Sequence, residues 1–501
     1  RFTGYKCLCR RRNNTCNERG RKLSKKEKKT VNKSIEKNVQ IKHYWLIIAG
    51  LTLAGLLIRL MILALPEKFF YIPDHMNNWI WARHSVEYGL MERYGYNRQD
   101  YCFTYGPPLE VQVDKMFTDP DGKIYRPGDI VTLPGRPWKF LPVSYPPFYV
   151  YIRHIFGLFH RFLDIKMEPL TPAAWFSLQL PNYIADWILA LGCLCTVRRW
   201  KGEKEGLIAF ILMWFSPAVL LTGVLWTQCD SWYLALAVWC MYFLMENKWA
   251  ISGIIWALVV LVKPQSLFMI PPLGYFFFAG KRFKPFLIYC VTALLAIMVI
   301  TAPFMFKSGP AWISNTYLYH FTDKFAAYTT FKGFNIWMVD LILGGHDLNI
   351  YSTIFGISKK MWGLLFLITG LIISFIACHR RYKNHVLSLP MLLSMTFIVI
   401  FLFSTQVHER FIIYILPFIL ISAFIENNFR AIFAGYSIIG FFEVTHHILL
   451  PSCLNLIDAK PFDMFFILIL SIAGICLFFY LLYNLFNSSF NRDTIITETG
   501  S

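Results

Sequence analysis

Apolar residues dominate the chain in runs of about twenty that recur from residue 44 to residue 486. An α-helix needs a run of this length to cross the hydrocarbon core of a bilayer. The pattern therefore predicts an all-α polytopic membrane protein with about twelve transmembrane helices. We expect these helices at residues 44–66, 172–197, 206–225, 231–246, 249–262, 266–280, 285–306, 360–378, 387–404, 411–426, 431–450 and 462–486.

A further apolar segment, 144–163, contains Arg153, His154, His160 and Arg161. Burying these side chains in lipid would be costly, so we interpret the segment as an amphipathic helix lying in the outer interface. The alternative is that it crosses the membrane. A crossing would place the basic cluster that follows residue 197 on the outer side of the membrane, against the positive-inside rule.

Charge sets the predicted orientation. About +12 of the formal net charge of +19 lies before residue 44, in a basic tail at 1–43. The positive-inside rule makes this tail cytoplasmic, and with twelve spans the tail at 487–501 is cytoplasmic too. The loops at 67–170 and 307–358 are then external. A basic tail before a span indicates contact with anionic membrane lipids, and we expect no nucleic-acid partner.

Composition agrees with a membrane protein. The chain is 56% hydrophobic and 16% charged, and its mean hydropathy is +0.45. Soluble domains carry more charge than this.

Six polar clusters interrupt the apolar pattern, and the predicted topology places all of them outside or at the outer ends of spans. They are Asp74, Tyr145-Pro146-Pro147, Trp226-Thr227-Gln228-Cys229-Asp230, Lys263-Pro264-Gln265, Asn335-Ile336-Trp337 and His408-Glu409-Arg410. Ionisable groups at membrane depth are functional by default, and a proline beside a lysine is expected where a broken helix lines a cavity. We therefore predict that the six clusters form one external site.

Each ionisable group also has a simpler interpretation. Asp74 could be the N-cap of an interfacial helix, and Asp230 could cap the fourth span. Lys263 could extend from a helix end towards the membrane surface. The segment 408–410 could be a solvated turn, although three adjacent ionisable residues leave almost no loop between two apolar runs.

The external loop contains a second acidic pattern. Asp119 and Asp121 resemble the D-x-D that holds a metal and a nucleotide sugar. Pro120 and Gly122 beside them are turn residues, so we predict a short hairpin here instead.

Glycosyl transfer from a lipid-phosphate sugar would use the six clusters. The donor phosphate leaves as an anion and needs fixed cations, which His408, Arg410 and Lys263 would supply. The acceptor hydroxyl loses a proton as it attacks the anomeric carbon, and Asp74 would accept that proton as catalytic base. A single in-line displacement inverts the anomeric configuration. The candidates for further substrate contacts are Tyr145, Trp226, Gln228, Asp230, Gln265, Asn335, Trp337 and Glu409.

The ordered set of motifs resembles the GT-C superfamily of glycosyltransferases over about residues 44–430. The resemblance is carried by Asp74, Y-P-P, the LPNYIAD segment with Pro181 and Asp186, W-x-Q-x-D, K-P-Q, N-x-W and H-E-R-F. It is closest to bacterial proteins related to the second mannosyltransferase of GPI-anchor synthesis. It is more distant to the dolichyl-phosphate-glucose glucosyltransferases of the endoplasmic reticulum.

The resemblance implies a GT-C fold with a conserved membrane module at 44–306 and a variable one at 307–486. It implies a polyprenyl-phosphate-linked hexose of mannose or glucose type as donor and a lipid-linked or cell-envelope glycan as acceptor. The active site would face outside, at the bacterial cytoplasmic membrane or, in a eukaryote, the endoplasmic reticulum membrane. Asp74 matches the family's catalytic aspartate, and His408 and Arg410 match its phosphate-facing positions.

The chain departs from the family pattern in a few places. Thr227 stands where the family often has glycine, and Gln406 stands where the endoplasmic glucosyltransferases have a histidine, which favours the bacterial branch. His75, Asn77 and Asn78 replace an acidic partner that some members carry. We therefore expect no metal and no other cofactor.

Two non-enzymatic functions remain as alternatives. A lipid-linked glycan flippase or transporter would also need cationic sites and many spans, but it should carry charged groups at several depths and internal symmetry. The polar groups of this chain gather at one face, and we find no repeat. A structural or assembly subunit would not need clustered external charges. The pattern favours a transferase.

Overall fold

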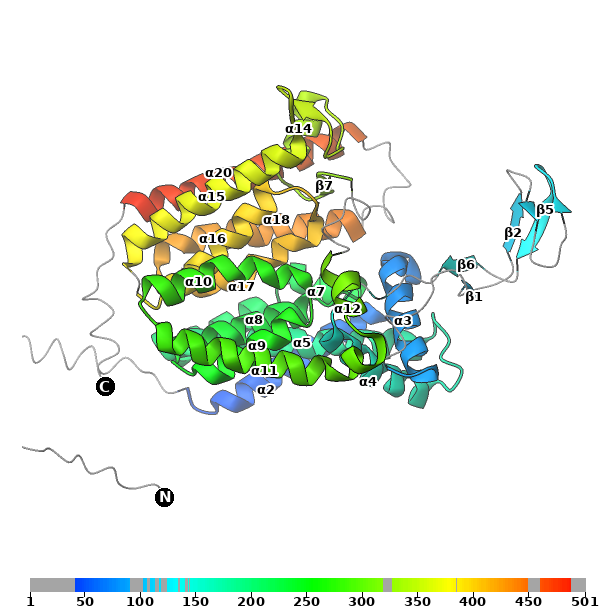
Figure 1. Cartoon of the computed structure of the whole chain (residues 1–501), viewed down its shortest axis with the longest axis horizontal. Helices are drawn as coiled ribbons and strands as arrows, with labels where there is room; N and C mark the ends of the chain where they lie inside the picture. The colour runs from blue at the N-terminus through cyan, green and yellow to red at the C-terminus, as the bar shows by residue number, and fades with distance from the viewer. Residues whose placement is uncertain are drawn as a thin grey trace, which may run out of the picture.

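The computed structural model describes residues 41–90, 102–105, 109–112, 117–118, 124–133, 136–139, 143, 145–318, 327–383, 385–448 and 460–487. Long helices lie side by side in a bundle, which confirms the expected all-α fold (Figure 1). The two predicted tails fall almost entirely outside the described residues.

A helix lies at each predicted span. In chain order these are α2 (Tyr44–Leu63), α5 (Pro172–Lys201), α6 (Glu203–Trp214) with α7 (Pro217–Leu225), α8 (Asp230–Met245), α9 (Trp249–Val260), α10 (Ile270–Ala279), α11 (Phe283–Ser308), α15 (Lys359–Tyr382), α16 (Ser388–Phe403), α17 (Leu416–Ile425), α18 (Arg430–Ile448) and α20 (Lys460–Asn487). By length and composition, five of the described helices could cross a membrane, or six if α6 and α7, bent by 42°, form one span. The others are shorter or less apolar, so the count of twelve spans stays a prediction.

The chain breaks between α9 and α10, where the sequence predicted a bend. Pro264 has no amide proton, and its ring favours an extended conformation for the preceding residue. Lys263 accordingly has φ −152° and ψ 135°, and a short 3₁₀ helix, η3 (Pro264–Met269), leads into α10. The break turns the buried Lys263 side chain towards the start of α8, to which it donates a hydrogen bond.

Two helices, α3 (Ile72–Glu87) and α4 (Pro147–Leu163), lie at one end of the bundle, opposite the first turn of α2 and the last turn of α20 (Figure 1). Helix α4 buries Arg153 and His160 and leaves Phe162 81% exposed. A helix with its polar groups inward and its apolar groups outward suits a lipid environment. The amphipathic helix expected at 144–163 is therefore present, and its in-plane position stays a prediction.

Short strands pair within the loops. They are β1 (Cys102–Tyr105) with β6 (Arg136–Lys139), β2 (Leu109–Gln112) with β5 (Ile130–Leu133), β3 (Phe117–Thr118) with β4 (Ile124–Tyr125), β8 (Thr353–Ile354) with β9 (Ile357–Ser358), all antiparallel, and β7 (Thr330–Phe331) with β10 (Val407–His408) in parallel. The β3–β4 pair confirms the predicted hairpin, while its turn, with Asp119 and Asp121, lies outside the described residues.

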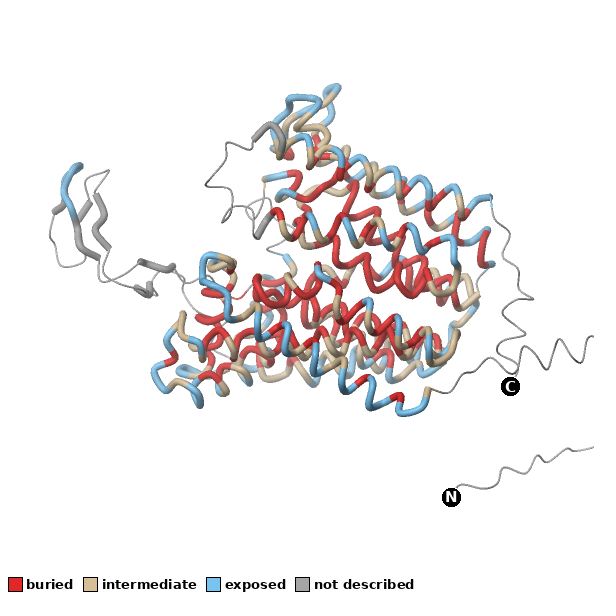
Figure 2. The backbone as a smooth tube through the Cα atoms, turned by 180° about the vertical axis from the view of Figure 1, so that it is seen from behind, coloured by how far each residue is buried: buried red, intermediate tan, exposed pale blue. Residues whose placement is uncertain are grey.

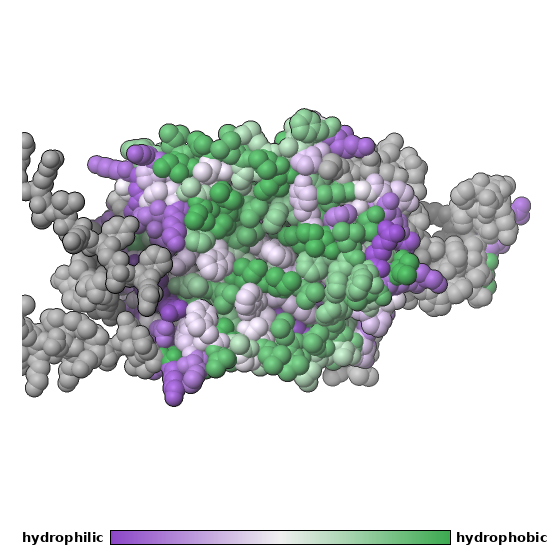
Figure 3. All heavy atoms as spheres, turned by 90° about the horizontal axis from the view of Figure 1, so that it is seen from below, coloured by the Kyte–Doolittle hydropathy of each residue, from purple (hydrophilic) through white to green (hydrophobic). Residues whose placement is uncertain are grey.

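Buried side chains concentrate on the inner helices, and every residue of α16 is buried (Figure 2). The view from below shows apolar residues over the middle of the molecule and polar residues towards both ends (Figure 3). This distribution is typical of a bundle that sits in a bilayer, where a lipid-facing belt must be apolar.

The core also contains an ion pair. Arg59 of α2 donates through Nε (3.2 Å) and Nη2 (2.9 Å) to Oδ2 of Asp186 in α5, and both side chains are 0% exposed. The guanidinium lies 3.7 Å above the Trp214 ring, and Ser231 donates to the other carboxylate oxygen. Every charge in this cluster thus has a partner, as burial at this depth requires.

Candidate active site

Asp74 lies in the first turn of α3, and its side chain is 23% exposed. Its Oδ2 accepts a hydrogen bond from Nε1 of Trp226 (2.7 Å) and another from Nε2 of Gln228. Its own side chain does not cap the helix, which excludes the simple N-cap interpretation. Burial raises the pKa of Asp74, although Arg410 and the hydrogen bonds from Gln228 and Trp226 act in the opposite direction.

The segment that holds Asp74 is itself held firmly. Thr227 has a φ of +58°, which is an outlier for a β-branched residue and explains why glycine suits this position. Asn78 donates to the Thr227 carbonyl (2.9 Å), and Gln179 donates to its hydroxyl (2.6 Å). The amide of Tyr71, just before α3, donates to the carbonyl of Leu225 (2.9 Å). Two motifs far apart in sequence are thereby fixed together.

Asp230, the first residue of α8, is fully buried. Its Oδ1 accepts hydrogen bonds from the ammonium of Lys263 and the hydroxyl of Tyr414. Lys263 is only 2% exposed, and its charge is neutralised by this carboxylate. The sequence predicted Lys263 as a direct phosphate ligand. In the structure its ammonium forms an ion pair with Asp230.

Arg410 joins the two carboxylates. Its Nη1 lies 3.9 Å from Oδ2 of Asp74, and its Nε lies 3.5 Å from Oδ2 of Asp230. The guanidinium is 5.3 Å from the centre of the Trp226 ring and 11% exposed. Of the three predicted phosphate-binding cations, Arg410 is the one that forms an ion pair with Asp74.

Glu409 is the third carboxylate. Its Oε1 lies 3.9 Å from Nη1 of Arg410, and its side chain is 3% exposed. Burial raises its pKa from 4.5 to about 7, with Arg410 opposing the change and Asp74 adding to it. A carboxyl group with a pKa near 7 is partly protonated at neutral pH.

His408 precedes this pair on strand β10. Its ring stacks on that of Phe331 with centroids 4.4 Å apart and 7° between the planes. The parallel pairing of β7 with β10 places Phe331 beside His408. The backbone of Lys332 also forms an isolated β-bridge with that of His408. Lys332 contributes a further positive charge, which acts on Glu409.

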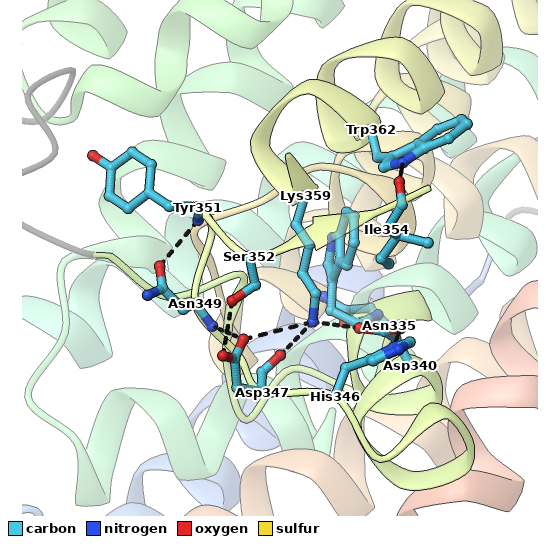
Figure 4. A network of polar contacts seen from close by, with 11 residues as sticks. Asn335, Asp340, His346, Asp347, Asn349, Tyr351, Ser352, Ile354, Lys359 and Trp362 are labelled. Carbon is cyan, nitrogen blue, oxygen red and sulfur yellow. Dashed lines mark hydrogen bonds and ion pairs between the residues drawn. The ribbon is translucent and has the colours of Figure 1, made fainter. Parts of the chain in front are cut away.

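A network of polar contacts surrounds Lys359, and we call Lys359, Asp340 and Asp347 the Lys359 clamp (Figure 4). The ammonium of Lys359 donates to Oδ2 of Asp340 (2.6 Å) and to the carbonyl of Asp347. Asp347 also accepts from the amide of Asn349 (3.0 Å) and the hydroxyl of Ser352 (2.8 Å). The clamp folds the loop between α14 (Ile336–Gly344) and α15 into a fixed shape.

That loop continues into the site through the backbone. The amide of Thr329 donates to the carbonyl of Leu348 (2.7 Å), and the amide of Gln406 donates to the carbonyl of Thr329 (2.8 Å). A continuous path of hydrogen bonds thus joins the Lys359 clamp to β7 and to the segment 406–410.

The remaining predicted residues differ in their placement. Tyr145 donates to the amide oxygen of Gln228 (3.2 Å) and so belongs to the cluster around Asp74. Gln265 has no hydrogen-bond partner for its buried Oε1 among the described residues. Asn335 caps α14 by accepting from the amide of Trp337 (3.1 Å), and Trp337 donates to the carbonyl of Ser404 (2.8 Å). The hydrogen bonds of these two side chains join the start of α14 to the end of α16, and none that involves the described residues links them to Asp74.

The contacts of His75 are with the segment around Pro169 and with Trp175. Its Nε2 is 2.7 Å from the carbonyl of Pro169, and its ring stacks on Trp175 at 3.6 Å. Burial lowers its pKa to about 3, so it is neutral. Among the described residues, no three His, Cys, Asp or Glu side chains are grouped as a metal site requires. The expectation that no metal takes part stays a prediction.

Sequence reasoning missed several residues of this site. Asn78 donates a hydrogen bond to the carbonyl of Thr227, beside the two donors to Asp74. Tyr414 donates a hydrogen bond to the carboxylate of Asp230. Lys332 adjoins His408. Polar residues flanking the motifs were visible, but only the fold shows which of them point inward.

The model of glycosyltransferase family 87 matches residues 144–405, just over half of the chain. The match includes the motifs from Tyr145 to Trp337, whereas Asp74 and the segment 408–410 lie outside it. No curated protein sequence matches the chain.

Among solved structures, the chain is similar to the oligosaccharyltransferase of Archaeoglobus fulgidus tethered to an acceptor peptide that contains an NVT sequon. The two are 15% identical, with a TM-score of 0.34. The match covers 70% of this chain and 48% of that one.

Proposed function

Since the chain belongs to glycosyltransferase family 87, we propose that it transfers one hexose from a polyprenyl-phosphate carrier to a glycan acceptor, with Asp74 as the base. Family membership confirms a membrane glycosyltransferase of the GT-C superfamily, as the motifs suggested. The nearer likeness to bacterial relatives of the GPI-anchor mannosyltransferase stays part of the proposal.

One observation supports the proposal most strongly. The carboxylate of Asp74 and the guanidinium of Arg410 lie 3.9 Å apart at one end of a membrane bundle. A base and a cation side by side suit a displacement in which a hydroxyl loses a proton while a phosphate leaves. The Trp226 and Gln228 hydrogen bonds to Oδ2 leave Oδ1 of Asp74 for the acceptor hydroxyl.

The reaction proceeds in one step. The acceptor oxygen attacks the anomeric carbon, its proton passes to Asp74, and the bond from that carbon to the phosphate oxygen breaks. The electron pair of the broken bond stays on the phosphate, which Arg410 and His408 stabilise. Lys263 acts through its pair with Asp230, which fixes one side of the Arg410 guanidinium. Attack and departure on opposite faces invert the configuration.

The donor is a hexose of mannose or glucose type, and the acceptor is a lipid-linked or cell-envelope glycan. The site faces outside, because the basic tail before α2 is cytoplasmic and the six motifs lie at the opposite ends of the spans. For a bacterium this is the outer face of the cytoplasmic membrane, and for a eukaryote the lumenal face of the endoplasmic reticulum. No metal or other cofactor is part of the proposal.

The test uses purified full-length protein in lipid vesicles, a panel of polyprenyl-phosphate hexoses and extracted membrane lipids. Release of free polyprenyl phosphate is measured for the wild type, for Asp74→Asn and for Glu87→Gln. The last variant makes the same carboxylate-to-amide change on α3, at a position whose ion pair in the described part of the chain is with Arg83.

We expect release with one donor, at least about a hundredfold loss in Asp74→Asn, and wild-type rates in Glu87→Gln. Full activity of Asp74→Asn would remove Asp74 from the mechanism. If no donor supports release, but labelled glycolipid moves between the leaflets, the chain is a flippase.

A further inference from the structure

A buried guanidinium lies behind the base, and the proposed mechanism does not use it. Arg153 of α4 is 0% exposed, and among the described residues its Nη2 has no hydrogen-bond partner. Its Nη1 donates to the carbonyl of Leu178 in α5 (3.0 Å), and its Nε donates to the hydroxyl of Tyr149 (2.6 Å). A buried charge paired only with neutral groups is costly. Its contacts therefore indicate what it does.

The contacts of Arg153 continue to Asp74 in two further steps. Tyr149 donates its hydroxyl proton to Oδ1 of Asn78 (2.6 Å). The Asn78 amide nitrogen then donates to two carbonyls, that of Asp74 (2.8 Å) and that of Thr227 (2.9 Å). Tyr149 is 1% exposed and Asn78 is 3% exposed, so both side chains are shielded from bulk solvent.

The direction of this chain is fixed by chemistry. Arginine has no acceptor, so the oxygen of Tyr149 must accept from Arg153 and give its own proton to Asn78. That sets the Asn78 oxygen towards Tyr149 and its amino group towards Thr227. Hydrogen bonds in series polarise one another, so the cation strengthens each of them in the same direction.

The last bond holds the segment that orients Asp74. Thr227 has a φ of +58°, a conformation that persists only when neighbours impose it. Trp226 and Gln228, on either side of it, donate the two hydrogen bonds that the Asp74 carboxylate receives. Release of Thr227 would therefore move both donors away from the base.

We infer that Arg153 is a positioning residue, which through Tyr149 and Asn78 holds the segment 226–228 against Asp74. The inference rests on the proposed function, because it assigns the relay to the base of that reaction. The charged and titratable groups around Asp74 itself are Arg410, Glu409, Lys263, Asp230, Tyr71, Tyr145 and Tyr149. Of these, Tyr149 alone belongs to the relay, so the relay variants leave the other six in place.

The test compares Arg153→Met, Arg153→Lys and Tyr149→Phe with Tyr151→Phe in the full-length protein. Tyr151 is a matched control, because it lies on the same helix but donates to the carbonyl of Ile300 in α11 (3.2 Å). We expect Arg153→Met and Tyr149→Phe to lower kcat about tenfold or more while KM for the donor changes less than about twofold. Arg153→Lys, which is also only a donor, should restore part of kcat.

The pH profile separates positioning from simple structural damage. Hydrogen bonds to a carboxylate favour its charged form, so their loss raises the pKa of Asp74. The acidic limb of the kcat profile should then move to higher pH in Arg153→Met and Tyr149→Phe, and stay in place in Tyr151→Phe. Equal limbs in all four proteins, or a change in KM alone, would overturn the inference.

A second readout does not depend on turnover. Dicyclohexylcarbodiimide reacts with protonated carboxyl groups, and mass spectrometry of the peptide with Asp74 gives the pH midpoint of its labelling. A higher midpoint in Tyr149→Phe, which removes one oxygen atom, supports the relay even if Arg153→Met does not fold. Wild type without activity on any donor would refute the proposed function, and an unchanged midpoint in Tyr149→Phe would refute the relay.

Discussion

Arg410 holds a guanidinium nitrogen 3.9 Å from the carboxylate of Asp74. Through Nε it also lies 3.5 Å from Asp230, so Asp74 and the Lys263–Asp230 pair share one cation. A guanidinium that already lies between carboxylates is held in place before the substrate arrives. In the proposed reaction, the charge that develops on the leaving phosphate would then meet a cation that needs no reorganisation.

Replacement of Arg410 should therefore affect binding and turnover together. We expect Arg410→Met to lower kcat/KM by about a hundredfold or more and to weaken donor binding, because the phosphate is charged in both ground and transition states. Loss of Arg410 also removes a charge that lowers the pKa of Asp74, so the acidic limb of the pH profile should move to higher pH. Steady-state kinetics and donor binding measure both effects.

Arg83→Met is the control for Arg410. Arg83 pairs with Glu87 on the surface of α3, with a side chain 28% exposed. It should leave donor affinity unchanged. An Arg410→Met protein that binds donor like the wild type would remove Arg410 from the phosphate site.

Glu409 predicts a dependence of stability on pH. Its pKa rises from 4.5 to about 7 on folding, mainly through burial, so the folded protein binds this proton more tightly than the unfolded chain. Its contribution is fully present below pH 4.5 and is lost as the pH rises through about 7. The loss amounts to about 3 kcal/mol at most.

Thermal unfolding of wild type and Glu409→Gln isolates this effect. The two proteins should have the same Tm near pH 4.5, and the wild type should fall below the variant as the pH rises to 7. Subtracting the Tm of the variant from that of the wild type at each pH removes the contributions of the other titrating groups, which the two proteins share. A constant difference in Tm across this range would contradict the prediction.

The helices were predictable because a long apolar run is almost sufficient by itself to predict a helix in a membrane protein. Each expected span has a helix in the structure. That Asp74 and Arg410 lie in one site was predictable, because charged groups stand out in an apolar chain. Pairing was not: nothing in the sequence shows that Lys263 is neutralised by Asp230 rather than directed at a phosphate. Which partner a buried charge takes depends on how the helices pack.

Other features needed the structure, although one left a trace in the sequence. Arg59 is the single charged residue of the first predicted span, and Asp186 is the single charged residue of the second. Two opposite charges in neighbouring spans already suggest a pair. Asn78 and Tyr149 gave no such signal, because polar residues are ordinary in an interfacial helix.

Each partner of the Arg59–Asp186 pair should be needed to compensate the buried charge of the other. Removal of one partner leaves an uncompensated buried charge, and we expect Arg59→Met to lower the free energy of unfolding by about 3–5 kcal/mol. The double variant Arg59→Met with Asp186→Leu should recover most of this loss, because no charge is then left unpaired. Denaturation in detergent measures each value.

The surface pair of Arg199 and Glu246 provides the control. The Arg199 side chain is 55% exposed, and exposed pairs contribute about 0–1 kcal/mol. Arg199→Met should therefore be close to wild type. Equal effects of Arg199→Met and Arg59→Met would show that burial is not what gives the inner pair its strength.

The Lys359 clamp should act on the site from a distance (Figure 4). Its ammonium is 1% exposed and holds Asp340 together with the Asp347 loop, and that loop pairs with the segment before β7. We expect Lys359→Met to reduce the free energy of unfolding by about 3 kcal/mol and to weaken donor binding through the displacement of His408.

His346→Gln separates the clamp from its surroundings. His346 contacts the same carboxylate of Asp340 at 2.6 Å, but its side chain is 47% exposed, so its loss should change stability by less than about 1 kcal/mol. Unfolding and donor titration are measured on both variants. If Lys359→Met lowers the free energy of unfolding but leaves donor affinity unchanged, the hydrogen-bonded path from Asp347 to His408 does not link the clamp to donor binding. A loss of both properties in Lys359→Met alone shows that the loop between α14 and α15 determines the geometry of the phosphate site.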